Sequence, residues 1–490
     1  MTDALILAVP LAPLAGALLV RLPRTPAGAD RVNVLGASVC ATVALVACVL
    51  GVLHGGRGLH GSWFVLDRAG ASFLAVIAVI GWCSAIVSPA YLAGAGKSLF
   101  TARRARAWYY TAFYLFWGAL LALALARNLG VAWLLIAATT GASALLVAYS
   151  GRASALEAGW KYLVLTTFGL AVALLGILIL FVGLAPHGGT LATLDWQNIA
   201  RRSPGLAPQT ALFALILILV GLAAKIGWAP VHNWLPDAHS EAPAPISALL
   251  SAVLLPSVLL VAWRASNALT PSIGGTTAQS VLLGFGLLSL AVAVPFLWQR
   301  LPWKRLLAYS SLEHMGVIAI GIGFGTPLAL AGVAVHIAGH ALAKALGFYA
   351  AVPLLGHEPS AGTHAAAGVA HTQPALATIM GVSIGALAGL PPSPLFASEV
   401  LIVAGGFAAG RPWTAAISAL LLALGFLGLA HALIETTAGD APSRDRRLAP
   451  GIRGVTALAG VTVACLLALA AAALWLPGSD LARALVAGIR

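Results

Sequence analysis

Ionisable residues set inside long apolar runs are the features of this sequence that could do chemistry. Between Lys225 and Pro245 the chain carries one lysine, two histidines, two carboxylates and four prolines, with apolar runs on both sides. Ionisable groups at membrane depth are costly and usually serve ion or proton movement. We therefore interpret the segment as part of an ion or proton path, with the candidates Lys225, His232, Asp237, His239 and Glu241.

Lys225 stands in the stretch Gly-Leu-Ala-Ala-Lys-Ile-Gly-Trp, several residues from either end of its apolar run. Removal from water disfavours the ammonium form, which allows a lysine to exchange protons near neutral pH. The alternative is a lysine that stays charged beside one carboxylate and only clamps the packing. The break in the helix next to it favours the proton role.

A second candidate group repeats every four residues. His336, His340 and Lys344 share one face of a helix, each one turn from the next. Imidazoles titrate near neutrality and can accept on one nitrogen while donating from the other, so this row suits a proton relay. Two rivals remain: a zinc site, for which no third ligand stands nearby in the sequence, and histidines that simply pack in a core.

Five further residues complete the candidate set. Glu399 follows Pro-Ser-Pro-Leu-Phe-Ala-Ser and would end the pathway in the second half of the chain. Glu157 and Lys161 are spaced to pair on one helix face, either as part of a lateral polar axis or as an interfacial anchor. The neighbours Glu313 and His314 allow the same two interpretations. For Asp237, His239 and Glu241, a solvated loop is the alternative to a proton entrance.

The elements that must position these residues are membrane helices. The 490 residues are 60% hydrophobic and only 8% charged, with a mean hydropathy of +0.97, which excludes a soluble globular protein. Apolar runs of about 20 residues recur along the chain, as α-helical spans require, whereas the short alternating segments of a barrel are absent. We predict an all-α polytopic membrane protein with about fourteen spans, near residues 4–20, 32–53, 70–92, 107–126, 129–149, 160–183, 209–230, 242–263, 278–298, 306–324, 328–355, 374–409, 413–437 and 452–476.

The basic residues indicate orientation rather than nucleic-acid binding. The formal net charge is +13, but the basic residues are scattered over short loops and form no stripe. One set of alternate loops holds fifteen of them and the other set, with the C-terminus, holds nine. The positive-inside rule then places both termini outside the cytoplasm, in a bacterial inner membrane. Cys40, Cys48, Cys83 and Cys465 stand singly in apolar runs, so we expect core residues and neither disulfides nor metal ligands.

Two predicted spans are interrupted. The seventh contains Gly227 and Pro230 and ends at Pro236, and the twelfth contains Gly389 followed by prolines. Broken helices in corresponding positions are the best sequence pointer to an inverted-repeat transporter. Because the breaks lie five spans apart, we predict one membrane domain over residues 1–490, with inverted five-helix repeats near 107–263 and 278–437. Ordinary proline kinks are the alternative.

Several motifs in order resemble one family. The segment from Lys225 to Ala248, the string Lys304-Arg-Leu-Leu-Ala-Tyr-Ser-Ser-Leu-Glu-His-Met-Gly, the histidine row and the break after Gly389 resemble the antiporter-like membrane subunits of respiratory complex I. That family also takes in Mrp-type cation/proton antiporters and membrane-bound hydrogenases. The strings His239-Ser-Glu-Ala-Pro and Glu157-Ala-Gly-Trp-Lys-Tyr look most like the hydrogenase-4 component F branch.

The resemblance implies a fourteen-helix, proton-translocating subunit that binds no cofactor and is driven by redox chemistry elsewhere. Its partners would be other membrane subunits, a peripheral redox arm and the lipid bilayer. It assigns Lys225, the histidine row with Lys344, and Glu399 to the proton path. The sequence departs from relatives at Ala137, where they carry a glutamate, and at Pro256, where complex I subunits often have a lysine.

The chain itself carries no iron–sulfur cysteine cluster and no dinucleotide fingerprint, so chemical catalysis would belong to another subunit. The alternatives are a stand-alone or Mrp-like cation/proton exchanger, the membrane half of an inorganic-carbon uptake pair, and a structural subunit whose first half no longer pumps.

Overall fold

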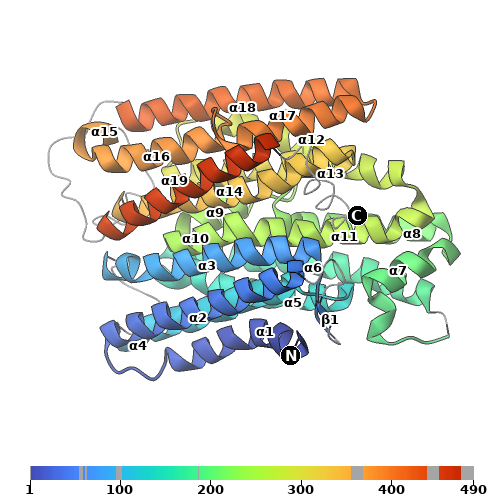
Figure 1. Ribbon diagram of the computed structural model, residues 1–490, viewed down its shortest axis with the longest axis horizontal. Helices are drawn as coiled ribbons and strands as arrows, with labels where there is room; N and C mark the ends of the chain where they lie inside the picture. The colour runs from blue at the N-terminus through green and yellow to red at the C-terminus, as the bar shows by residue number, and fades with distance from the viewer. Residues whose placement is uncertain are drawn as a thin grey trace.

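The chain folds as a bundle of long helices that lie side by side along one common axis (Figure 1). The computed structural model describes residues 2–53, 59–60, 63–94, 102–185, 187–354, 368–438 and 452–475. Within these residues the only paired strands are β1 (Leu59–His60) and β2 (Val65–Leu66), which form one short antiparallel hairpin. The all-α prediction is therefore confirmed.

The helices of the first half share high apolar content and few charges. They are α1 (Thr2–Leu19), α2 (Pro26–Leu53), α3 (Arg68–Gly94), α4 (Ala102–Ala124), α5 (Leu129–Val147), α6 (Ala153–Leu184), α7 (Trp196–Arg202), α8 (Pro208–Ile226), α9 (Leu235–Glu241), α10 (Ala244–Leu249) and α11 (Leu255–Ile273). Short 3-10 turns η1 (Ala148–Ser150), η2 (Leu191–Leu194) and η3 (Ser203–Gly205) lie between them, and the π-turn η4 (Leu250–Leu254) joins α10 to α11.

The second half continues the same pattern. Its helices are α12 (Gly275–Leu297), α13 (Trp303–Phe324), α14 (Pro327–Leu354), α15 (Val369–Thr372), α16 (Pro374–Leu387), α17 (Pro394–Ala408), α18 (Pro412–Ala438) and α19 (Ile452–Trp475). The N-terminal helices α1, α2 and α4 form one side of the molecule and α16, α17 and α18 the opposite side (Figure 1).

Eleven helices in the described residues are long and apolar enough to cross a membrane. The shorter apolar helices are α1, the consecutive pair α16 and α17, and α19. Counting that pair as one interrupted span gives fourteen spans, as the sequence predicts. The protein is a multi-pass membrane protein.

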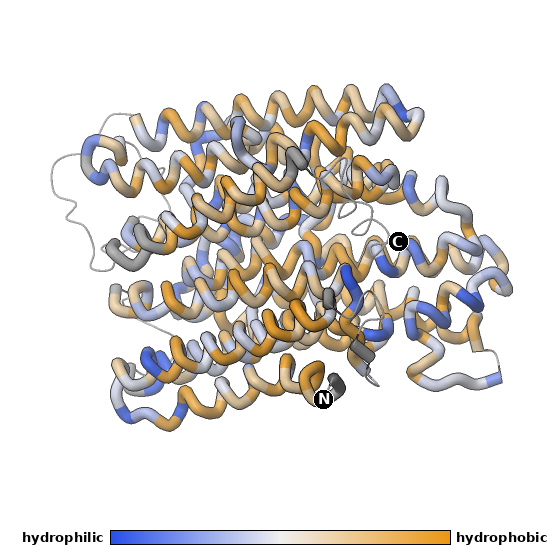
Figure 2. Tube along the Cα trace, viewed as in Figure 1, coloured by the Kyte–Doolittle hydropathy of each residue, from blue (hydrophilic) through white to orange (hydrophobic). Residues whose placement is uncertain are grey.

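The helices carry mainly apolar residues along their length (Figure 2). Trp413 and Phe168 are 82% and 71% exposed, as expected of side chains that face lipid. Cys40 and Cys48 are buried as expected and Cys83 is half-buried. Cys465 is exposed on α19, so the prediction that it is a core residue is wrong; a cysteine is apolar enough to lie on either face of a membrane helix.

Both predicted breaks are real and have the same local cause. Helix α8 ends where Gly227 takes φ 79°, and α16 is followed by Gly389 at φ 74°. Only glycine adopts such angles without strain, and the prolines that follow each glycine cannot donate a helix hydrogen bond. The chain resumes as α9 after the first break and as α17, capped by Ser393, after the second. At the first break the backbone N–H of buried Ala229 donates to Ser289 Oγ at 3.1 Å, whereas residues 390–392 of the second break are exposed.

Candidate functional site

Lys225 lies fully buried in the last turn of α8, surrounded by hydroxyl groups. Its Nζ lies 2.7 Å from Thr140 Oγ1 and 2.5 Å from the Tyr162 hydroxyl oxygen, and 4.4 Å from the centre of the Tyr162 ring. These are the two side-chain hydrogen bonds that the described residues give it, and neither partner is a carboxylate. The alternative of a lysine clamped by one carboxylate therefore does not describe this site.

The hydroxyl protons around Lys225 are committed elsewhere. Ser143 donates to the Thr139 carbonyl and lies 2.7 Å from the Tyr162 hydroxyl, so Tyr162 donates to Ser143. Thr140 donates to the Ile136 carbonyl at 3.1 Å. Both oxygens that face Lys225 consequently accept from its Nζ. The network solvates the amine but offers it no group that takes up a proton readily.

Lys344, the buried lysine of α14, has a different environment. Its Nζ donates to the Leu307 carbonyl at 2.6 Å and to Ser310 Oγ, both on α13. One turn further along α13, the buried carboxylate of Glu313 is close enough to interact electrostatically with Lys344. The second lysine therefore has an acidic neighbour inside the bundle.

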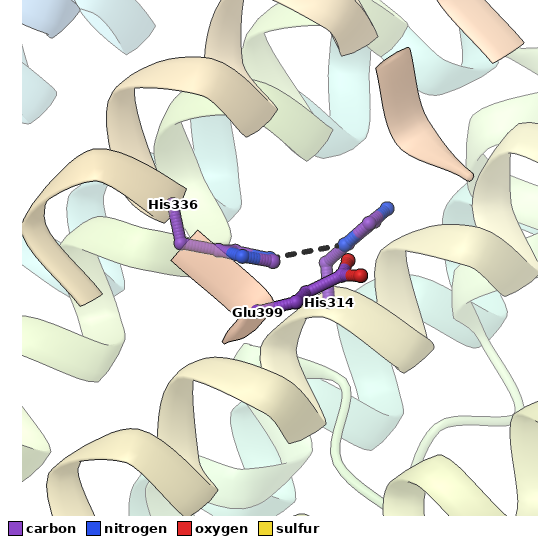
Figure 3. A group of neighbouring side chains, drawn as sticks. All are labelled: His314, His336 and Glu399. Carbon is purple, nitrogen blue, oxygen red and sulfur yellow. Dashed lines mark hydrogen bonds between the residues drawn. The ribbon is translucent and has the colours of Figure 1, made fainter. Parts of the chain in front are cut away.

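Two of the predicted histidines form a hydrogen-bonded chain whose proton positions follow from Ser398 on α17. Ser398 donates to the Leu395 carbonyl at 2.7 Å, so its oxygen must accept from His336 Nδ1 at 2.8 Å. His336 Nε2 then accepts from His314 Nδ1 at 3.0 Å (Figure 3). Neutral His314 is left with a bare Nε2, which is buried and has no hydrogen-bond partner within the described chain.

His340 lies beside the hydrogen-bonded histidines His314 and His336 but makes no hydrogen bond to either of them. Its ring is 5.1 Å from the His314 ring, centre to centre, in an edge-on arrangement. Both of its nitrogens are buried and lack a partner among the residues that the structure describes. Buried polar atoms are normally satisfied, so these nitrogens indicate a place for water or a moving proton. The alternative that the histidines are satisfied core residues fits His336 and does not fit His340.

Two carboxylates, Glu313 on α13 and Glu399 on α17, each lie against a glycine. A Cβ atom at Gly425 on α18 would come within 2.0 Å of Glu313 Oε1, and one at Gly389 would come within 2.6 Å of Glu399 Oε2. Each carboxylate therefore occupies space that a side chain would otherwise fill. Glu399 is partly exposed, unlike Glu313, which fits its predicted place at the end of the row.

His239 occupies the region between the two lysines. It is fully buried on α9, and its Nδ1 donates to the Leu235 carbonyl at 2.9 Å, which leaves Nε2 unpartnered within the described structure. Its ring packs between Trp234, which contacts Tyr162, and Phe348 of α14. A hydroxyl pair, Ser251 and Ser311 at 2.7 Å, also joins the two halves.

The remaining candidates form ion pairs at the edge of the bundle. Asp237 bridges Arg305 at 2.5 Å and Lys161 at 3.6 Å, and Lys161 also pairs with Glu157 at 2.5 Å. Glu241 pairs with Arg152 at 2.7 Å. All of these pairs retain partial solvent exposure. His232, in the loop after the first break, is half-buried, and its Nδ1 has no partner in the part of the chain that the structure describes.

Sequence reasoning missed the groups that act through hydroxyls. Ser398, Thr140 and Tyr162 orient the ionisable residues, yet single hydroxyl residues in apolar helices carry no distinctive sequence signal. Lys304 lies just outside the predicted span 306–324, yet it is buried and donates to the Ser240 and Ala242 carbonyls at the end of α9. A cation there complements the negative end of that helix.

Comparison with known proteins identifies the family of this chain. Residues 126–425 match the family model described as NADH:quinone oxidoreductase/Mrp antiporter, transmembrane. A hydrogenase-4 component F homolog from Methylacidiphilum infernorum is 32% identical over 383 residues, covering 78% of this chain and 80% of that protein. An NADH-quinone oxidoreductase subunit N from Desulforudis audaxviator is 28% identical, covering 79% and 76%.

Solved structures show the same fold. A chain of the Mrp complex from Dietzia sp. DQ12-45-1b superposes with a TM-score of 0.81 at 19% identity, covering 100% of this chain and 96% of that one. A chain of an archaeal membrane-bound sulfane sulfur reductase gives 0.80 at 22% identity, covering 100% and 99%. The chain belongs to the NADH:quinone oxidoreductase/Mrp antiporter transmembrane family, to which its motifs point.

Proposed function

We propose that this chain is a proton-conducting membrane subunit of a complex-I-like or hydrogenase-4-like assembly. The observation that carries the proposal is the buried polar row of the second half. It consists of Lys344, Glu313, His340, His314, His336 and Glu399, contributed by α13, α14 and α17. Buried ionisable groups in such a row are expensive and are kept where they move charge.

The chemistry of the row favours protons over sodium. Sodium, like other hard cations, requires a cage of oxygen ligands, whereas this row is dominated by nitrogens. In the bonded pair, a proton accepted at His314 Nε2 releases the proton from Nδ1 to His336, whose Nδ1 proton faces Ser398. A lysine and a carboxylate at the two ends supply and remove the proton.

In the first half, Lys225 would serve as a secondary site. His239 is the buried group through which it would communicate with Lys344, since it lies near both the Trp234–Tyr162 pair and α14. As part of the same proposal, protons would enter from the edge of the bundle through its ionisable residues, Asp237, Glu241, Glu157, Lys161 and His232.

Internal symmetry supports the proposed repeats. In the first half α4 packs on α5, α5 on α6 and α6 on α8; in the second half α12 packs on α13, α13 on α14 and α14 on α17. Each series ends at a broken helix. We assign the inverted repeats to residues near 107–263 and 278–437 on this ground.

The excess of basic residues in one set of loops supports termini outside the cytoplasm, in an inner membrane. Seven of these basic residues lie outside the described residues: Arg57, Lys97, Arg444, Arg446, Arg447, Arg483 and Arg490.

The names of the relatives support partners: other membrane subunits and a peripheral redox arm that performs the catalysis, with no cofactor in this chain. The alternative is a stand-alone exchanger, or the membrane half of an inorganic-carbon uptake pair.

Two measurements test the proposal. Affinity purification of the tagged chain from its native membrane, followed by mass spectrometry, should recover nickel-iron or quinone-module subunits; a single partner or none favours the alternative. The purified assembly is then placed in liposomes that contain a pH-sensitive dye, and proton flux is measured while the redox partner turns over. Redox turnover with no proton flux above that of empty liposomes would contradict the proposal.

A further inference from the structure

Three side chains from three helices converge on one point inside the second half: His314 of α13, His336 of α14 and Glu399 of α17 (Figure 3). One potential ligand atom from each lies within 4.8 Å of the other two. Both histidines are buried and Glu399 is partly exposed. We propose that this cluster binds a divalent transition metal of the zinc class, which occupies the proton row and blocks it.

The ligand set suits that class of ion. Two imidazoles and one carboxylate are the three protein ligands of many zinc sites that keep one position open. Magnesium and calcium prefer oxygen ligands throughout, so the nitrogens select against them. In the sequence, His336 and His340 are the candidate pair of zinc ligands, at i and i+4. In the structure, the second histidine of the cluster is His314 from the neighbouring helix, and His340 is not part of it.

The spacing already approaches that of a bound ion. Ligands of a tetrahedral zinc ion are separated by about 3.3 Å, as its metal–ligand distances require. His314 Nδ1 and His336 Nε2 are 3.0 Å apart, and their present bond is a shared proton. An ion takes the place of that proton, which moves to the unpartnered His314 Nε2. The ligand atoms lie within 4.8 Å of one another, so the Glu399 carboxylate must approach the two nitrogens by up to about 1.5 Å, which rotation of its side chain can provide.

Two features beyond the ligands themselves indicate a prepared site. Ser398 accepts from His336 Nδ1, which turns the Nε2 lone pair toward the cluster, as a hydrogen bond to the second nitrogen does in metal-binding histidines. Gly389 leaves the space that the Glu399 carboxylate occupies, since a Cβ there would lie 2.6 Å from Oε2. The partial exposure of Glu399 provides an approach from the side of the break.

The test uses the full-length purified protein, stripped with a chelator and carrying a tag without histidine. Zinc is titrated against a chromogenic chelator, and cobalt is added as a spectroscopic probe of tetrahedral coordination. We expect one tight zinc site per chain and the visible absorption of tetrahedral cobalt. Both are lost in His336→Gln and in Glu399→Gln.

Ser398→Ala, which keeps all three ligands, should weaken zinc binding by about 10- to 100-fold, the usual cost of removing such a support. His431→Gln is the matched control, because His431 is exposed on α18, where it lies beside Glu435 and Trp298 and takes no part in the cluster. Equal zinc affinity in the wild type, His336→Gln and Glu399→Gln would overturn the proposal, as would the absence of a tight site in the wild type.

The blocking effect rests on the proposed function and is measured separately. In liposomes, zinc should stop proton flux and a chelator should restore it. Suppose that one zinc ion binds per chain through these residues and the proton flux persists. The metal site is then confirmed. The blocking effect is overturned, and so is the proton route through His314 and His336. Loss of binding in the ligand variants together with persistent zinc inhibition would show that zinc blocks elsewhere.

Discussion

Lys225 and Lys344 are both fully buried on apolar helices, yet their surroundings differ in kind. Lys225 faces the hydroxyls of Thr140 and Tyr162, whereas Lys344 lies near Glu313 and the histidines. Hydroxyls solvate an amine but exchange protons poorly near neutral pH, while imidazoles and perturbed carboxylates do so readily. The same residue type, buried on two apolar helices, is thus equipped for proton transfer in the second half and mainly for burial in the first.

The first prediction tests this difference directly. Lys344→Met should lower redox-coupled proton flux by about 100-fold, the order of loss expected when a proton-transfer group is removed. Lys225→Met should lower it much less, because no buried carboxylate among the residues that the structure describes partners that lysine. Both substitutions keep a long side chain in the same space. Equal losses from the two variants would show that the halves do equivalent work.

The second prediction displaces Glu313 without altering any ionisable residue. A methyl group at Gly425 would lie 2.0 Å from Glu313 Oε1, so Gly425→Ala must move that carboxylate. We expect a loss of proton flux of about 10-fold, since small misplacements of reacting groups are costly. Gly428→Ala is the control one turn away, where the atoms nearest to the added one belong to Leu297 and Trp298, at 3.1 Å. Similar losses from both would indicate a general packing effect.

The third prediction makes the first half more like the second. Ala137 lies one turn before Thr140 on α5, so Ala137→Glu places a carboxylate toward the Lys225 side of that helix. We expect proton flux per redox turnover to rise by roughly two-fold at most, since the subunit would gain one competent half. The increase should vanish when Lys225→Met is added. Ala137→Gln matches the size without the charge and should change nothing.

The smallest effect concerns stability. Thr140→Val removes one acceptor of the buried Lys225 amine and should lower the free energy of unfolding by about 1–3 kcal/mol. Thr139→Val is the matched control, because Thr139 is equally buried and its hydroxyl donates only to a carbonyl of its own helix. Thermal unfolding in detergent compares the two. A larger loss from Thr139→Val would mean that the amine does not depend on Thr140.

Much of the fold was readable from the sequence because the bilayer imposes it. A span must be apolar over about 20 residues and must satisfy its backbone internally, so run length alone located the helices. Glycine and proline in the seventh and twelfth spans located the breaks for equally local reasons. Four-residue spacing placed His336, His340 and Lys344 on one face of α14.

What the sequence could not decide is which of these residues meet. His314 and Glu399 lie 22 and 63 residues from His336, yet all three converge because α13, α14 and α17 pack together. Ser398 fixes the proton positions of that pair and Gly425 makes room for Glu313, although neither residue is distinctive in the sequence. The sequence marks Gly389 as a helix break, but not as the space that the Glu399 carboxylate occupies. Helix formation depends on local residues and on the membrane, whereas a proton path depends on contacts a few ångströms long between helices, which only the packed bundle creates.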